Sequence, residues 1–313
     1  MTFRNRVTPS HLLVMAVLLG PVVASSDASA QSASTLAWAP RPSRLVPYAA
    51  PNRPLWKLSD ILARHAGEKD WSEPVADTPD FVARYVSMAP GKSTQNIMYA
   101  DDRAFWVVES GQIRFQIEGQ ASFVATKGFL VQVPARTAFT LETAGNEPSL
   151  RFELHPAEAP IYPISETPAP GSGVSYIKAA FKGRGAYDTA NRPFLDFEKD
   201  VVQDGKPAPA TVLKDPYLSV EVFRGPPQPL PPDSDWGHFR ANFPGFWFVL
   251  EGKQNFLIEG EKPFTASEGD VVFAPVGRFH RVSSGGDGMS TRLAITPRPP
   301  SLHYTQLGST GGD

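Results

Sequence analysis

The chain has 313 residues, a formal net charge of −2, no cysteine, 32 prolines and 25 glycines. This length provides for two cores of ordinary size. Because Lys and Arg are balanced by Asp and Glu and form no basic run, we expect no nucleic-acid partner. The absence of cysteine excludes disulfides and a thiol-linked lipid anchor.

Residues 1–30 have the pattern of a secretory signal. Two arginines precede an apolar run over residues 12–24, and residues 28–30 (Ala-Ser-Ala) are small at the spacing that a signal peptidase accepts. A Gly-Pro pair interrupts the run, which is too short to cross a bilayer. We therefore predict cleavage before Gln31, no membrane anchor after cleavage, and a periplasmic or secreted protein.

Residues 31–54 are rich in Ala, Pro and Ser and indicate an extended arm. Apolar residues at helical spacing then predict a short helix over residues 58–67, capped by Ser59 or Asp60. Arm and helix together make up residues 31–78, and we expect them to pack against a barrel.

A stretch at 104–139 recurs without a gap at 245–280, 141 positions later. Both copies alternate apolar and other side chains over three short segments with glycine in the intervening turns. This pattern predicts three strands of a small antiparallel barrel. The sequence Asn-Arg-Pro that starts at Asn52 also recurs at Asn191, so the repeat unit is about 110 residues long, which favours two fused domains and an internal duplication.

These repeats predict the domain boundaries. After the signal peptide and the arm, the N-terminal barrel occupies residues 79–160, a Pro-rich linker with a second leader 161–214, the C-terminal barrel 215–298, and a tail that is expected to fray 299–313.

The sequence GFWFVLEG at 245–252, followed by Gly269, Pro275-Val276-Gly277 and His280, resembles the two motifs of the cupin family. Because the pattern occurs twice, the chain is similar to a bicupin. The resemblance implies an all-β fold of two tandem cupin-type jelly-roll β-barrels, packed as an internal pseudo-dimer. Bicupins include dioxygenases, decarboxylases, isomerases and non-catalytic binding proteins, so the resemblance does not select a reaction.

In metal-binding cupins the first motif supplies two His and one Glu, and the second motif supplies a further His. In the C-terminal half these four positions fall on His238, Arg240, Gly245 and His280. A guanidinium has no lone pair to donate, so the ligand set that the resemblance implies is incomplete. A divalent metal on the two imidazoles would need Asn242, Asp235 or an exogenous ligand, and the cofactor stays unknown.

The leading interpretation is a cationic pocket in the C-terminal barrel that binds a carboxylate, a sugar acid or another small polar or anionic molecule. Arg240 would hold the anion beside Trp247 and Asn242, and His238 and His280 would act as acid/base groups or as the remnant of a metal site. Two other functions stay open, namely a metal-dependent dioxygenase, decarboxylase or isomerase and a non-catalytic scaffold. Arg240 could also face solvent. Homo-oligomerisation is open as well.

The N-terminal half lacks the metal ligands. Its corresponding positions are Ile97, Tyr99, Ala104 and Phe139. We expect this barrel to be a structural partner of the other, or to bind an uncharged ligand against Tyr99 and Phe139. The sequence gives no geometric reason to place His155 or His303 in a pocket.

Overall fold

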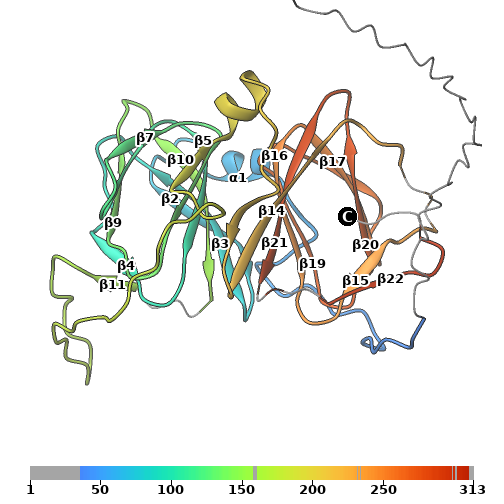
Figure 1. Cartoon of the computed structure of the whole chain (residues 1–313), viewed down its shortest axis with the longest axis horizontal. Helices are drawn as coiled ribbons and strands as arrows, with labels where there is room; N and C mark the ends of the chain where they lie inside the picture. The colour runs from blue at the N-terminus through green and yellow to red at the C-terminus, as the bar shows by residue number, and fades with distance from the viewer. Residues whose placement is uncertain are drawn as a thin grey trace, which may run out of the picture. The chain divides into compact units, whose positions relative to one another are not determined.

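The computed structural model describes residues 36–157, 161–230, 232, 234–297, 299 and 302–309. Residues Ala39–Asp313 form one compact unit in which strands predominate (Figure 1). The predicted signal peptide at 1–30 lies outside the described residues. Within the described part of the chain, no helix has the length and apolar content needed to cross a membrane.

Four antiparallel sheets are found among the described residues, and they form two jelly-roll barrels. The six-stranded sheet of the N-terminal barrel has the order β12 (Phe194–Asp196), β8 (Phe129–Val133), β5 (Ala104–Ser110), β10 (Ser149–Pro156), β3 (Phe81–Met88) and β2 (Trp71–Asp77). Its five-stranded sheet has the order β11 (Ile161–Pro163), β4 (Ile97–Tyr99), β9 (Phe139–Thr143), β6 (Ile113–Ile117) and β7 (Phe123–Ala125).

The C-terminal barrel has two sheets of the same sizes. The six-stranded sheet has the order β1 (Leu55–Trp56), β19 (Val271–Ala274), β16 (Gly245–Glu251), β21 (Ser290–Pro297), β14 (Leu218–Gly225) and β13 (Thr211–Lys214). The five-stranded sheet has the order β18 (Phe264–Ser267), β17 (Lys253–Ile258), β20 (His280–Gly285), β15 (His238–Arg240) and β22 (His303–Thr305). The expected all-β class with two barrels is confirmed.

Each leader comes directly before one barrel in the sequence but adds a strand to the other barrel. β1 precedes the N-terminal barrel but pairs with β19, with Leu55 opposite Val272. β12 precedes the C-terminal barrel but pairs with β8, with Leu195 opposite Leu130. The sheets therefore extend across the predicted boundaries, and β2 and β22 lie in segments predicted to be arm and tail.

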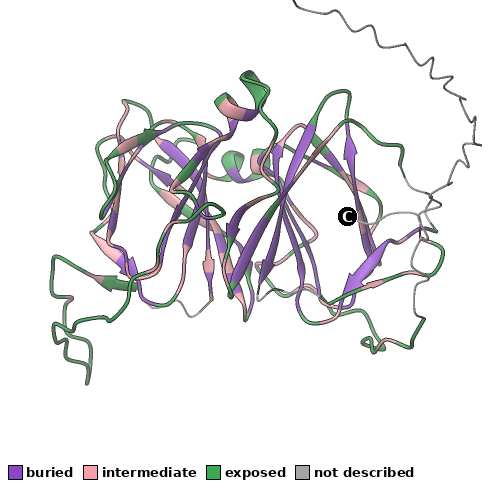
Figure 2. Ribbon diagram, in the orientation of Figure 1, coloured by how far each residue is buried: buried purple, intermediate pink, exposed green. Residues whose placement is uncertain are grey.

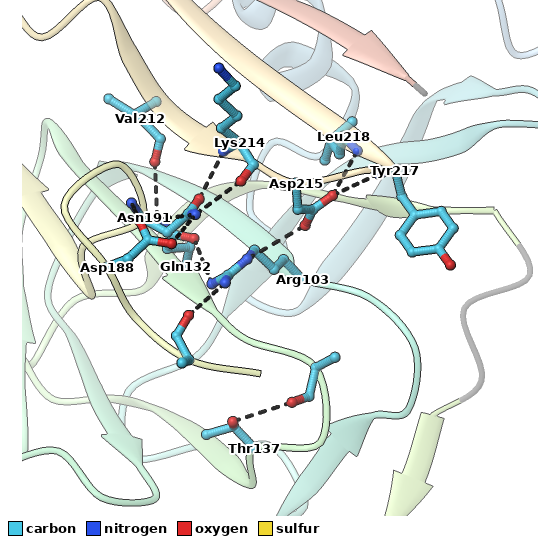
Figure 3. A network of polar contacts seen from close by, with 12 residues as sticks. Arg103, Gln132, Thr137, Asp188, Asn191, Val212, Lys214, Asp215, Tyr217 and Leu218 are labelled. Atoms are coloured by element: carbon cyan, nitrogen blue, oxygen red, sulfur yellow. Dashed lines mark hydrogen bonds and ion pairs between the residues drawn. The ribbon is translucent and has the colours of Figure 1, made fainter. Parts of the chain in front are cut away.

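The repeated Asn-Arg-Pro sequences hold the leaders through an amide clamp. Asn191 Nδ2 donates to the carbonyl of Lys214 at 2.9 Å, and its Oδ1 accepts from Lys214 N at 2.8 Å (Figure 3). Asn52 makes the same pair with Asp77, at 2.7 Å and 3.0 Å. One amide thus pairs both backbone groups of a residue at the end of an outer strand, which explains why asparagine recurs there.

The helix predicted over 58–67 is α1 (Leu58–Arg64), with Ile61 buried. The prediction of a cap by Ser59 or Asp60 is wrong, since Lys57 holds the N-cap position without a side-chain cap bond. Asp270 of the C-terminal barrel accepts from Leu58 N at 2.9 Å instead. A distant carboxylate therefore satisfies a backbone donor of this helix end. The second leader carries the π-helix η1 (Glu198–Gln203).

One aromatic core joins the barrels, and separate cores fill their interiors. Side chains alternate along β16, so that Phe246 and Phe248 face the shared core while Trp247 faces the interior of the C-terminal barrel. Across the shared core, the ring centroids of Phe81 and Phe246 are 4.8 Å apart, as are those of Phe152 and Phe248. The central strands are buried along most of their length (Figure 2). The barrels therefore pack sheet against sheet.

Candidate functional site

Strand register brings His238 and His280 together in the C-terminal barrel. The two residues lie opposite each other where β15 pairs with β20. Their ring centroids are 4.5 Å apart at an interplanar angle of 70°. His238 is 5% exposed and His280 is 1% exposed. Motif spacing alone thus located a buried pair of imidazoles on neighbouring strands.

Arg240 points into the same barrel. It is 3% exposed, its Nη1 lies 3.3 Å from Thr296 Oγ1, and its guanidinium carbon lies 5.7 Å from the centroid of Trp247. The rings of Trp247 and His280 meet edge to face, with their centroids 4.9 Å apart. The guanidinium, the indole and the imidazole therefore form one buried cluster, and the alternative in which Arg240 faces solvent is wrong.

The position where metal-binding cupins have Glu is closed by the indole. A Cβ placed on Gly245 would overlap the six-membered ring of Trp247. Trp247 therefore occupies the space into which a third ligand would project. Among the described residues, no group of three or more His, Cys, Asp or Glu side chains could hold an ion. Two imidazoles beside a guanidinium do not fit a divalent metal.

The two residues considered as auxiliary ligands have other contacts. Asn242 is exposed, and its Oδ1 accepts from Leu302 N at 3.3 Å. Asp235 forms an ion pair with Arg281 and accepts from Gly237 N at 3.3 Å. The structure thus brings His238, His280, Arg240 and Trp247 together and leaves Asn242 at the surface.

His280 is held in one tautomer by its backbone surroundings. Its Nδ1 lies 3.0 Å from the carbonyl of Arg278, so Nδ1 carries the proton and donates. Its Nε2 is buried and has no hydrogen-bond partner among the described residues. Burial, and then the neighbouring His238 and Arg240, lower the pKa of His280 well below its ordinary value. At neutral pH this ring is uncharged and presents a lone pair at Nε2.

Sequence reasoning missed the contact of His303. β22 pairs with β15 and places His303 opposite Arg240. The exposed imidazole of His303 stacks on His238, with ring centroids 4.7 Å apart and an interplanar angle of 26°. The tail was expected to fray, and the contact of His303 with His238 depends on the pairing of β22 with β15, for which the sequence contained no signal.

The interior of the N-terminal barrel is aromatic, with a buried ion network beside it. Tyr99 stacks on Phe139, their centroids 6.0 Å apart. Glu153, 6% exposed, accepts from Arg151 and from Arg84 at 2.7 Å each. Burial alone would raise the pKa of Glu153, but the two guanidinium groups together lower it. No sequence pattern had pointed to this network.

A cavity of about 300 Å³ lies between the barrels. Its charged lining comprises Glu109, Lys127, Glu198, Glu251 and Glu268. Lys127 of the N-terminal barrel forms an ion pair of 2.6 Å with Glu268 of the C-terminal barrel. Burial, followed by the charge of Glu268, raises the pKa of Glu109 to about 8. No sequence pattern had pointed to this cavity.

Comparison with known proteins gives similarity in structure only. No protein-family model matches the sequence, and no curated protein does. Among solved structures, a salicylate 1,2-dioxygenase from Pseudaminobacter salicylatoxidans is 14% identical with a TM-score of 0.59, and the match covers 85% of this chain and 90% of that one.

A tryptophan-to-tyrosine mutant of that enzyme in complex with gentisate is 13% identical with a TM-score of 0.59, and the match covers 85% of this chain and 88% of the mutant enzyme. A cupin 2 conserved barrel domain protein from Leptotrichia buccalis is 14% identical with a TM-score of 0.49, and the match covers 75% of this chain and 94% of that protein. At such identities the similarity to the dioxygenase identifies a fold. This chain has the fold of two tandem cupin-type jelly-roll barrels.

Proposed function

We propose that this protein is a bicupin with an incomplete metal-binding motif, whose C-terminal barrel binds a small polar or anionic molecule. The observation that carries the proposal is Arg240, a buried guanidinium beside an indole and a neutral imidazole. A buried arginine is a strong and geometrically specific partner for a carboxylate. The duplicated sequence supports descent of both barrels from one ancestral barrel.

The two polar groups of the cluster select different parts of a ligand. Arg240 donates hydrogen bonds, whereas His280 Nε2 accepts one. Trp247 supplies an apolar face between them. A carboxylic acid that also carries a hydroxyl satisfies all three, with its carboxylate on Arg240 and its O–H donated to His280. Because the lowered pKa leaves this ring uncharged at neutral pH, its Nε2 would accept the hydrogen bond from the hydroxyl.

The cellular setting is part of the proposal. The N-terminal sequence supports export to the periplasm or beyond, without a membrane anchor after cleavage. The near-neutral composition supports a small-molecule ligand in place of nucleic acid. The aromatic interior of the N-terminal barrel supports a structural role for that half.

Acid binding tests the proposal directly. We expect acetate, lactate, benzoate, salicylate or gentisate to raise the melting temperature of the mature protein, and the matching amides to have no effect. Salicylate and gentisate belong in the panel because the solved structures with this fold include a salicylate 1,2-dioxygenase and its complex with gentisate. Stabilisation by amides and acids alike would contradict an anion site.

Replacement of Arg240 by Met should weaken binding of the acid roughly 10- to 100-fold, because a hydrogen bond to a charged group contributes about 1.5–3 kcal/mol. Isothermal titration measures the change, and Arg240→Lys should lose less because it keeps the charge. Arg114→Met removes a surface arginine that pairs with Glu142 and is the matched control. Equal affinity in Arg240→Met and the control would exclude Arg240 as the anchor.

The metal-dependent enzyme is the alternative, and elemental analysis separates the two functions. Because the donor set at His238 and His280 lacks a third ligand, the mature protein should retain well below one ion per chain after incubation with Fe²⁺, Mn²⁺, Ni²⁺, Cu²⁺ or Zn²⁺ and desalting. Near-stoichiometric metal that is lost in His280→Ala would favour the enzyme.

A further inference from the structure

Residues 39–48, which we call the strap, run from the start of the compact unit along the C-terminal barrel (Figure 1, blue). Arg41 Nε donates to the carbonyl of Gly277 at 2.7 Å, and its guanidinium also pairs with Glu259. The guanidinium carbon lies 4.8 Å from the ring centroid of Phe279 and 5.7 Å from that of Phe239. These phenylalanines are the sequence neighbours of His280 and of His238, so the strap contacts the segments that carry the site.

Arg278 joins the strap to His280. Its side chain is almost fully buried, and Nη2 and Nε donate to the carbonyl of Val46 at 2.8 Å and 3.2 Å. Nη1 donates to the carbonyl of Glu259 at 3.0 Å, and the guanidinium lies over the ring of Tyr48 at 4.5 Å. The backbone carbonyl of the same residue accepts from His280 Nδ1 at 3.0 Å. Arg278 thus binds the strap with its side chain and orients the imidazole of His280 with its backbone carbonyl.

The loop that carries Arg278 is held by the barrel as well as by the strap. Gly277 N donates to the carbonyl of Arg240 at 2.9 Å, and Arg278 Nη1 also pairs with Glu261 Oε1 at 3.2 Å. Gly277 has a φ of 77°, which favours glycine, and a Cβ there would come within 2.7 Å of Pro42 in the strap. Close packing of Pro42 on this glycine therefore fixes the peptide that precedes Arg278. Without the strap, the Gly277 carbonyl would lose its donor Arg41, and Arg278 Nε and Nη2 would lose their acceptor at Val46, while Nη1 would keep Glu259 and Glu261.

We propose that the strap positions His280. By anchoring Arg278, it keeps that carbonyl aimed at Nδ1–H and so keeps the Nε2 lone pair directed into the barrel. Arg41 and Arg278 are positioning residues in this arrangement. The consequence for ligand binding rests on the proposed function, whereas the effect on the tautomer does not.

The N-terminal barrel supplies a matched control. There Arg136 stands at the position of Gly277, donates to the carbonyls of Ala100 and Lys182, and so links its loop to the second leader. Gly185 of that leader donates to the carbonyl of Ala135 at 2.9 Å. The residue at the position of His280 in this barrel is Phe139. Loss of the contact between Arg136 and the second leader should therefore leave the tautomer of His280 unchanged.

Histidine tautomers can be read from ¹⁵N-labelled mature protein by long-range ¹H–¹⁵N correlation at one fixed pH, with His280→Gln to assign the signals. We expect wild-type His280 to give the Nδ1–H pattern. Arg278→Lys and Arg41→Gln should convert it to a mixture of tautomers, while Arg136→Lys leaves it unchanged. A single Nδ1–H tautomer in folded Arg278→Lys and Arg41→Gln would overturn the proposal, and circular dichroism establishes that the variants are folded.

Titration with salicylate, which carries both a carboxylate and a hydroxyl, separates this proposal from the binding function. If both hold, Arg278→Lys should weaken salicylate binding about fivefold or more relative to Arg136→Lys. If the tautomer follows the strap but salicylate and the other acids bind no variant, wild type included, the positioning role stands and the anion site fails. If wild type binds salicylate and Arg278→Lys binds it equally well with an unchanged tautomer, the strap proposal fails alone.

Discussion

Phe246→Ala is expected to destabilise the protein by about 3–5 kcal/mol and to affect both barrels together. The ring is fully buried in the core that the barrels share. Its centroid lies 4.8 Å from Phe81 and 6.3 Å from Phe152, both in the N-terminal barrel. Truncation therefore leaves a cavity that neither barrel can close by itself.

Urea unfolding followed by hydrogen exchange measures the effect. Peptides from β6 and β17, in the outer sheets of the two barrels, should lose protection at the same urea concentration. Phe264→Ala is the control, since this half-buried ring on the outer strand β18 stacks on Phe256 and has no part in the shared core. A wide separation of the β6 and β17 transitions in wild type would contradict a common cooperative unit.

Short apolar segments between glycine turns were sufficient to predict the barrels. Alternation along 104–110 and 245–251 predicted half-buried strands, and the structure places both as central strands that are buried on both faces. The sequence could not show which face met the other barrel, because Trp247 and Phe248 are equally apolar. Only the sheet packing separates interior from interface.

The exchange of leaders lay beyond any local pattern. The Asn-Arg-Pro repeat was visible, but the partners of Asn52 and Asn191 are edge-strand residues 25 and 23 positions away. The cap of α1 comes from Asp270, 212 positions distant from Leu58. Propensity favours Ser59 or Asp60 as the cap, and a long-range contact overrides it.

Motif spacing predicted which residues belong to the site, but not how their side chains are arranged. Fixed spacing within the motif placed His238, Arg240 and His280 on adjacent strands, because strand register converts sequence separation into proximity. The inward direction of Arg240 and the closure of Gly245 by an indole depend on packing between strands. For the same reason, no sequence pattern predicted that His303 stacks on His238.

Glu109→Gln is expected to stabilise the protein at alkaline pH. The pKa of Glu109 is raised to about 8, first by burial, then by Glu268, with Lys127 opposing and Asp270 adding to the shift. A carboxyl whose pKa is higher in the folded state binds a proton more tightly there than in the unfolded chain. Its contribution to stability is fully present below its ordinary pKa of about 4.5 and is lost as pH rises through 8.

Glutamine keeps the shape of the protonated acid and cannot ionise. At pH 9 the variant should exceed wild type in free energy of unfolding by on the order of 3 kcal/mol, a value reduced from the full linkage because Glu109 is partly exposed. At pH 4.5 the two proteins should be equal. Urea titrations at pH 4.5, 7 and 9 provide the comparison.

The position of Glu109 makes the barrel interface the element that responds. Its carboxyl faces Glu268 and Asp270 of the opposite barrel, beside the ion pair of Lys127 and Glu268. Ionisation therefore adds like charge across the interface and works against that ion pair, whereas the interior of each barrel is unaffected. At pH 9 wild type should exchange hydrogen faster than Glu109→Gln in β5 and in the turn at Gly269. A difference spread evenly over both barrels would contradict an effect located between them.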